Sequence, residues 1–139
     1  MDSIDSAPFI YLVEAHHIYR PVVEPFFTTA LEHGRNRAVT SVVTLPEVLV
    51  QPMKTERTDL QGAYRDLLTR GPSITLVDLT PITADLAAQL RSRYGLRLPD
   101  AFQLAAAIEH GASHFITNDT RLKKLTEIRV LVLDDYLPG

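Results

Sequence analysis

The pattern of apolar and polar residues alternates between short β-branched runs and longer stretches with helical periodicity. In the longer stretches, apolar residues recur at i, i+3, i+4 and i+7, the spacing of one helix face. The short runs are typical of strands buried within a sheet. The strands predicted from these runs cover residues 1–4, 38–43, 74–77, 114–117 and 129–133.

Prolines, glycines and small polar residues mark the ends of the helices predicted between these strands. The helices cover residues 6–13, 21–33, 45–52, 56–70, 81–94 and 99–110. Ser6 is the expected cap of the first, and Thr44 with Glu47 has the spacing of a capping box. Pro52 is expected to weaken or end the third helix. Gly95 and Gly111 suit the ends of the last two helices.

The alternation of strands and helices predicts the fold class. It favours an α/β domain, a three-layer α/β/α sandwich with a mainly parallel central sheet. A chain of 139 residues has the size of one domain, so we expect residues 1–139 to form a single unit. In such sheets, ligands bind beyond the carboxyl ends of the strands, where the strand order reverses.

Composition narrows the possible chemistry. The chain has no cysteine, which excludes disulfides, zinc–thiolate sites and thiol nucleophiles and fits a reducing compartment. Neither a signal peptide nor an apolar run of membrane-spanning length is visible, so we expect a cytoplasmic protein without a membrane partner. With a net charge of -3, binding to a polyanion would need a local basic rim, a metal ion, or both.

Four acids stand at positions where a parallel sheet could bring them together. Asp5, Glu47 and Asp119 each follow a predicted strand, and Asp100 begins the helix that leads into the fourth strand. Asp100 reaches the same edge only if the preceding helix, residues 81–94, returns the chain across the face of the sheet. Each acid also has a purely structural explanation, because carboxylates are common in first helical turns.

Converging carboxylates indicate a metal site. Like charges at close range raise each other's pKa, and a divalent cation relieves that repulsion. Oxygen ligands without histidine or cysteine favour Mg²⁺ or Mn²⁺. Such ions commonly serve phosphoryl chemistry, because they activate water and neutralise charge on phosphate.

The motifs around these acids resemble a known family, the PIN domains. The matching stretches, in chain order, are Asp5-Ser6-Ala7-Pro8-Phe9-Ile10-Tyr11-Leu12, Thr44-Leu45-Pro46-Glu47-Val48-Leu49-Val50, Pro99-Asp100-Ala101 continuing to Ala105-Ala106, Gly111, and Thr117-Asn118-Asp119. Their order and spacing are similar to those of the small VapC-type toxins of bacteria and archaea, and the resemblance covers nearly the whole chain.

This resemblance implies a function and assigns roles. It implies an Mg²⁺- or Mn²⁺-dependent ribonuclease, the toxin of a toxin–antitoxin pair, with RNA as substrate and a small antitoxin protein as partner. We also expect a homodimer. Asp5, Glu47, Asp100 and Asp119 match the acidic quartet. Asp5, Asp100 and Asp119 are then expected to hold the metal, with Glu47 holding or orienting a metal-bound water. Thr117 matches a polar residue of the same site and is expected to bind substrate.

Basic residues and a pair of histidines lie near these motifs. Arg121, Lys123 and Lys124 follow Asp119 and are predicted to bind substrate phosphates. The cluster Arg91, Arg93 and Arg97 is interpreted as cations at a helix end. The pair His16-His17 is interpreted as surface, because adjacent residues of a helix point in different directions.

Two other functions remain open from the sequence. The first is a non-catalytic PIN-fold binding module, although an intact acidic quartet argues against it. The second is a phosphatase of the haloacid-dehalogenase kind or a receiver domain. That phosphatase needs Asp-x-Asp, whereas Asp2 and Asp5 are three apart. A receiver needs a lysine at the end of the last strand, where Leu133-Asp134 stands.

Overall fold

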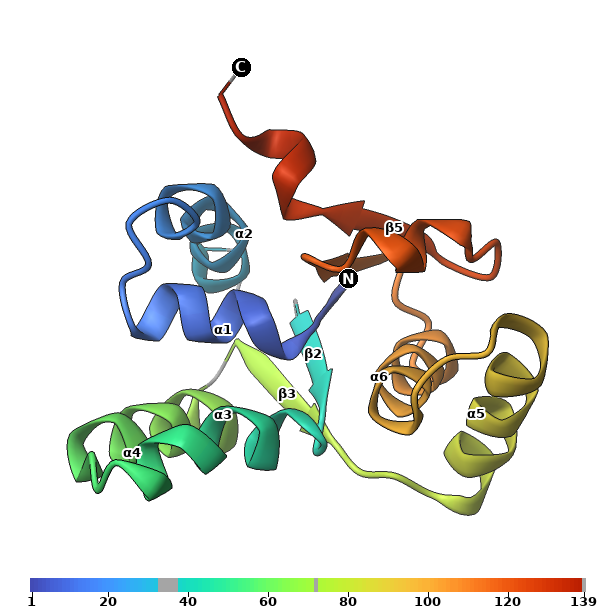
Figure 1. The fold of residues 1–139 in the computed structure, drawn as a ribbon, viewed down its shortest axis with the longest axis horizontal. Coiled ribbons are helices and arrows are strands. Elements are labelled where there is room, and N and C mark those ends of the chain that lie inside the picture. Colours follow the sequence, from blue (N-terminus) through green and yellow to red (C-terminus); the bar gives the residue numbers. More distant parts are fainter. Residues whose placement is uncertain (33–37, 72, 139) are drawn as a thin grey trace.

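The computed structural model describes residues 1–32, 38–71 and 73–138, and within them five strands form one parallel sheet. The strand order is β3-β2-β1-β4-β5, and every neighbouring pair is parallel (Figure 1). The strands are β1 (Asp2–Ile4), β2 (Ala38–Ser41), β3 (Ile74–Val77), β4 (His114–Thr117) and β5 (Arg129–Val132). The predicted α/β fold with a parallel sheet is confirmed.

Helices cover both faces of this sheet. The first face carries α1 (Ser6–Val13), α2 (Arg20–Glu32), α3 (Thr44–Lys54) and α4 (Thr58–Arg65), which continues as a π-helical turn, η1 (Asp66–Arg70). The second face carries α5 (Pro81–Tyr94) and α6 (Leu98–Glu109). Two 3₁₀ turns follow the last two strands, η2 (Thr120–Lys124) and η3 (Leu133–Tyr136). In the ranges that the structure describes, no helix combines the length and apolar character needed to cross a membrane.

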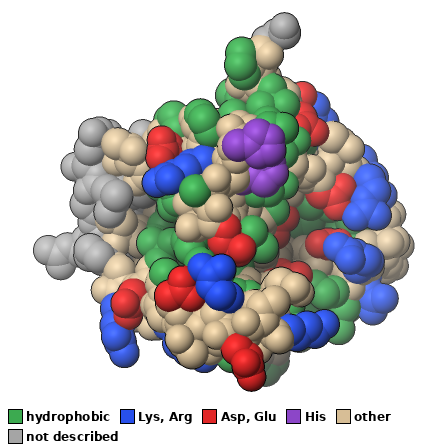
Figure 2. All heavy atoms as spheres, turned by 60° about the vertical axis from the view of Figure 1, so that its left-hand side comes forward, with side chains coloured by type: hydrophobic (Ala, Val, Ile, Leu, Met, Phe, Trp, Pro, Cys, Tyr) green, Lys and Arg blue, Asp and Glu red, His purple; other side chains and the backbone are tan. Residues whose placement is uncertain are grey.

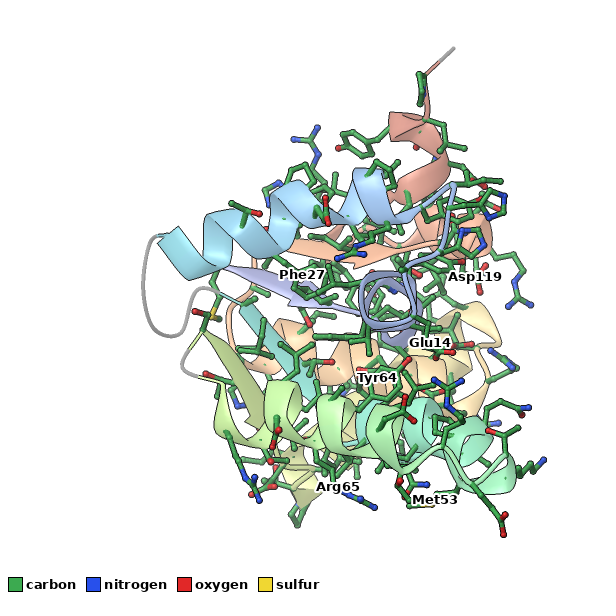
Figure 3. The ribbon with its side chains drawn as sticks, turned by 90° about the vertical axis from the view of Figure 1, so that its left-hand side faces the viewer. Glu14, Phe27, Met53, Tyr64, Arg65 and Asp119 are labelled. Atoms are coloured by element: carbon green, nitrogen blue, oxygen red, sulfur yellow. The ribbon has the colours of Figure 1, made fainter. Side chains whose placement is uncertain are left out.

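Two apolar cores lie on opposite sides of the sheet. Successive residues of a strand point to opposite faces, so Ile116 packs in the core beneath α1–α4 while Phe115 packs in the core beneath α5 and α6. Tyr64 is fully buried in the first core, and its hydroxyl donates to the carboxylate of Glu14. The two side chains point toward each other in Figure 3. Their hydrogen bond connects α4 with the end of α1.

The beginning of α1 differs from the sequence prediction. Asp5, not Ser6, is the N-cap, and its carboxylate accepts the Ser6 backbone N–H at 2.8 Å. A carboxylate is a good cap for the unpaired N–H groups of a first turn. The side chain of Ser6 is thereby left to bond elsewhere.

The capping box expected in α3 is also absent. Val43 precedes the helix without a side-chain cap, because the hydroxyl of Thr44 and the carboxylate of Glu47 bond to groups outside α3. Pro52 does not end this helix, which continues to Lys54 with the proline buried inside it.

The pairing of α5 with α6 decides where Asp100 lies. Thr80 and Thr83, at the start of α5, donate to Glu109 at the end of α6, so the two helices run antiparallel. Gly95 turns the chain between them at a φ of 66°, a left-handed conformation that favours glycine. Helix α5 therefore returns the chain to the carboxyl edge of the sheet, and α6 begins there.

Candidate metal centre

An open cleft of about 530 Å³ lies at the carboxyl edge of the sheet. It opens where the strand order reverses, between β1 and β4, and the Asp5 N–H donates to the Ile116 carbonyl at 2.9 Å there. The lining includes all four predicted acids with basic, hydroxyl and amide groups around them: Asp5, Glu47, Asp100, Asp119, Arg97, Arg121, Ser6, Tyr11, Thr117, Asn118 and Thr120. Asp100 and Asp119 thus line one cleft, which the sequence could not establish.

Asp5 lies beside neutral donors. Its carboxylate accepts the Ser6 N–H at 2.8 Å and the Thr117 hydroxyl at 2.7 Å. Burial raises the pKa of Asp5 to about 6 by making the charged form costly, and the negative charges of Glu47 and Asp100 add to the rise. These two hydrogen bonds lower the pKa but do not offset burial.

Glu47 is held by a polar network beneath the cleft. The Ser6 hydroxyl donates to its Oε1 at 2.6 Å, and the Gln103 amide nitrogen lies 3.4 Å from the same oxygen. Gln103 also donates to Thr44 at 2.8 Å, and Thr44 in turn shares a hydrogen bond with Thr40. Because buried polar groups need partners, these contacts fix the position of Glu47 from α1, α3 and α6 together.

Asp100 and Asp119 each pair with an arginine at the rim. Arg97 Nε lies 3.0 Å from Asp100, and Arg121 Nη2 lies 2.6 Å from Asp119. The arginine side chains are 68% and 67% exposed, whereas the two carboxylates are 13% and 23% exposed. The hydrogen bonds from Arg121 hold the pKa of Asp119 below its usual value. The exposed guanidinium groups can turn into solvent, which would leave two largely buried carboxylates without a counter-charge.

Comparison of the sequence with known families gives one match over most of the chain. The family profile described as "PIN domain" matches residues 4–128. The chain belongs to the PIN domain family. No curated protein sequence matches it. Membership in this family removes the phosphatase and receiver alternatives.

Three solved structures share the fold. The PIN domain is similar to a toxin–antitoxin complex from Klebsiella pneumoniae, with a TM-score of 0.70, 22% identity, and coverage of 96% of this chain and 98% of that one. It is similar to VapBC2 from Rickettsia felis bound to a promoter DNA fragment, with a TM-score of 0.76, 13% identity, and coverage of 94% and 97%. For DNA-bound VapBC from Salmonella typhimurium the TM-score is 0.74, the identity 15%, and the coverage 95% and 97%.

The donor set of the PIN domain fits a hard divalent cation. The four acids offer only oxygen ligands, the type that Mg²⁺ and Mn²⁺ prefer. Asp5 and Glu47 have no ion-pair partner among the described residues. In this conformation, however, no three acidic or histidine side chains of the described ranges are grouped closely enough to share one ion. Arg97 and Arg121 pair with two of the four carboxylates in this structure.

The predicted substrate residues fall in different places. Arg121 lines the cleft, but Lys123 pairs with Asp135 and Lys124 donates to the Tyr94 carbonyl at 3.0 Å, and neither lysine lines it. Thr117 is fully buried; its hydroxyl donates to Asp5 and accepts the Asp119 N–H at 3.1 Å. Thr117 is therefore placed to hold two acids at the wall of the cleft.

Sequence reasoning missed several residues of the site. Arg97 was interpreted as a helix-end cation, yet it lines the cleft beside Asp100. Gln103 was not singled out, although a polar residue within the apolar run of α6 was the available signal. Tyr11 and Asn118 also line the cleft, and the Asn118 amide donates to the Tyr11 hydroxyl at 3.0 Å.

Proposed function

We propose that this PIN domain is an Mg²⁺- or Mn²⁺-dependent endoribonuclease and the VapC-type toxin of a toxin–antitoxin pair. The observation that carries the proposal is the arrangement of Asp5, Glu47, Asp100 and Asp119, which come from four segments of the chain and line one cleft at the switch point of the sheet. Burial raises the pKa of Asp5, the negative charges of Glu47 and Asp100 add to the rise, and a cation would offset both. We treat residues 1–139 as one functional domain.

The residues of the cleft have distinct roles in this proposal. Asp5, Asp100 and Asp119 would hold the ion, which supplies a more acidic water and neutralises charge on the phosphodiester. Glu47, fixed by Ser6 and Gln103, would orient the attacking water. Thr117 holds Asp5 and Asp119 in place. Arg97 and Arg121 would leave their carboxylates for the phosphates of the RNA, to which guanidinium binds in a bidentate manner.

A small antitoxin is the proposed protein partner. Support comes from the three structural neighbours, which are a toxin–antitoxin complex and two VapBC complexes. Val50, Met53 and Leu98 are exposed apolar side chains that a partner could cover. We further propose a homodimer and a cytoplasmic location. Sedimentation of the purified protein tests the first of these, and fractionation of the source cells tests the second.

Cleavage of RNA tests the proposed activity. Purified wild-type protein should cleave single-stranded RNA with Mg²⁺ or Mn²⁺ and lose this activity in EDTA, and Asp100→Asn should abolish it. Asp78→Asn is the matched control, because Asp78 also follows a strand, β3, but is exposed and not among the cleft residues. Cleavage by Asp100→Asn at the wild-type rate would show that the site is wrongly assigned.

A non-catalytic binding module is the second candidate. The observation in its favour is that Arg97 and Arg121 already neutralise Asp100 and Asp119 without an ion. The same cleavage assay separates the two functions. Folded wild-type protein that binds Mn²⁺ weakly or not at all and leaves every RNA intact would support the module.

A further inference from the structure

A column of aromatic rings stands beside the acidic cleft. Tyr11, which lines the cleft, stacks on Tyr19 with ring centroids 4.6 Å apart. His16 packs against both tyrosines at tilted angles of 59° and 43°, with centroids 5.1 Å away in each case. His16 in turn stacks on His17, with centroids 5.1 Å apart and an interplanar angle of 13°. The cluster of Tyr11, Tyr19, His16 and His17 is called the ring column below.

The two histidines are not on a helix, contrary to the sequence interpretation. Helix α1 ends at Val13, and Ala15 has a φ of 54° that turns the chain back toward the helix. Because His16 and His17 follow this turn, their rings can lie parallel although they are adjacent in sequence. His17 is exposed, as the sequence suggested, and Figure 2 shows a histidine patch beside acidic and basic side chains.

Hydrogen bonds hold three of the four rings. The Asn118 amide donates to the Tyr11 hydroxyl, and the Tyr19 hydroxyl donates to the Asp134 carboxylate. His16 Nδ1 accepts the backbone N–H groups of Ile18 and Tyr19 at 3.2 and 3.3 Å. The ring column is therefore fixed before any ligand arrives, which lowers the entropy cost of binding to it.

We propose that the ring column is a stacking site for a base of single-stranded RNA, with His17 as its outer surface. This inference rests on the proposed function, because the stacked base belongs to the same RNA strand that enters the acidic cleft. One face of the His17 ring lies against His16, and its exposure leaves the ring open to a base. Stacked aromatic side chains bind successive bases of single strands with little need for sequence-specific hydrogen bonds.

The stacking geometry also predicts a preference among bases. A purine covers more of an aromatic ring than a pyrimidine does, so the column should favour adenine over uracil at this position. The neighbouring Ile18 side chain is 48% exposed and adds apolar surface beside His17. If the ring column instead bound a segment of a protein partner, no preference for purine over pyrimidine would be expected.

Equilibrium binding of labelled oligo(A) and oligo(U) of equal length, followed by fluorescence anisotropy in EDTA, tests the proposal without cleavage. Wild type should bind oligo(A) more tightly, and His17→Ala should weaken that binding about fivefold or more and remove the preference. His17→Phe should keep both, because it retains an aromatic face. His110→Ala is the matched control, since His110 is an exposed histidine at the opposite end of α6 from Asp100.

The outcomes separate this inference from the nuclease itself. Unchanged RNA binding by His17→Ala, or equal losses of binding in His17→Ala and His17→Phe, would overturn the stacking site. Unchanged binding would instead favour a protein partner for the ring column. Either result is compatible with intact Mn²⁺-dependent cleavage by wild type. Conversely, purine-selective binding through His17 without any cleavage would support the column and reject the nuclease.

Discussion

The hydroxyl of Thr117 donates to the carboxylate of Asp5 at 2.7 Å, across 112 positions of the sequence. The same hydroxyl accepts the Asp119 N–H, so one buried threonine at the end of β4 connects the first acid of the cleft with the last. Strands β1 and β4 are neighbours in the sheet, and their ends carry these two acids. The pairing of β1 with β4 thus sets the relative positions of Asp5 and Asp119.

Removing the Thr117 hydroxyl should move the pH dependence of activity. Thr117→Val deletes a donor that lowers the pKa of Asp5, so the pKa should rise above its present value of about 6. Because an ion binds the deprotonated carboxylate, Mn²⁺-dependent cleavage should then fall off at a higher pH than in wild type. Thr117→Ser keeps the hydroxyl and should keep the wild-type profile. Identical pH profiles for Thr117→Val and wild type would contradict the role assigned to the Thr117 hydroxyl.

Neutralising Asp5 should stabilise the fold. The pKa of Asp5 is 3.8 in the unfolded reference and about 6 in the folded protein, so the folded state binds this proton more tightly. The stabilisation is present below pH 3.8 and is lost as pH rises through 6, leaving a cost of at most about 3 kcal/mol at neutral pH. Asp5→Asn should therefore raise the melting temperature at neutral pH by several degrees, and the gain should shrink below pH 6.

Asp59→Asn serves as the control for that experiment. Asp59 is exposed, and its hydrogen bonds with Arg57 lower its pKa to about 2, so neutralising it removes a favourable charge. Its melting temperature should stay level or fall at neutral pH. A rise of equal size in both variants would show that the effect is general surface charge and not burial of Asp5.

Gln103→Leu should impair cleavage more than it impairs folding. The leucine removes the amide that contacts Ser6, Thr44 and Glu47, so Glu47 loses part of its support. It also removes the buried Gln103 carbonyl oxygen, which has no hydrogen-bond partner among the described residues and is itself costly. We expect kcat to drop about tenfold or more, the loss that goes with a misplaced catalytic group, with a melting temperature close to wild type.

Gln89→Leu is the matched control for Gln103→Leu. Gln89 is exposed on α5, and among the contacts described for its side chain it bonds only to Asp85. Both kcat and the melting temperature should stay at wild-type values. If Gln103→Leu unfolds the protein or leaves kcat unchanged, the network beneath Glu47 has no positioning role.

Two of the three basic residues after Asp119, Arg121 and Lys123, should behave differently. Arg121 lines the cleft, whereas Lys123 is paired with Asp135 away from it. Arg121→Met should raise KM for RNA and weaken the salt dependence of binding, because one phosphate contact is lost. Lys123→Met should change neither quantity. Equal effects of the two variants on KM would indicate a diffuse basic surface and no defined contact from Arg121.

The sequence predicted the sheet and three of the four acid positions for a physical reason. Short β-branched runs, prolines and glycines act locally, and parallel strands bring their carboxyl ends to one edge, which places Asp5, Glu47 and Asp119 there. The position of Asp100 depends on the antiparallel packing of α5 with α6 through Thr83 and Glu109, a contact that local patterns do not encode.

Other errors came from side chains with two plausible uses. Thr44 and Glu47 have capping-box spacing, but their side chains instead form hydrogen bonds with Gln103 on α6 and Ser6 on α1. The lysines after Asp119 resemble a phosphate site in sequence, and only the structure shows that Lys123 pairs with Asp135 and that Lys124 donates to the Tyr94 carbonyl. The role of Gln103 depends on hydrogen bonds with residues 56 and 97 positions away in the sequence, which local patterns do not reveal.

A crystal of the protein soaked in Mn²⁺, measured at the manganese absorption edge, tests the metal centre most directly. The account predicts anomalous density in the cleft within about 2.0–2.4 Å of carboxylate oxygens of Asp5, Asp100 and Asp119. It also predicts that Arg97 and Arg121 have turned away from Asp100 and Asp119. A fully soaked crystal with no density in the cleft, and both arginine pairs intact, would contradict it.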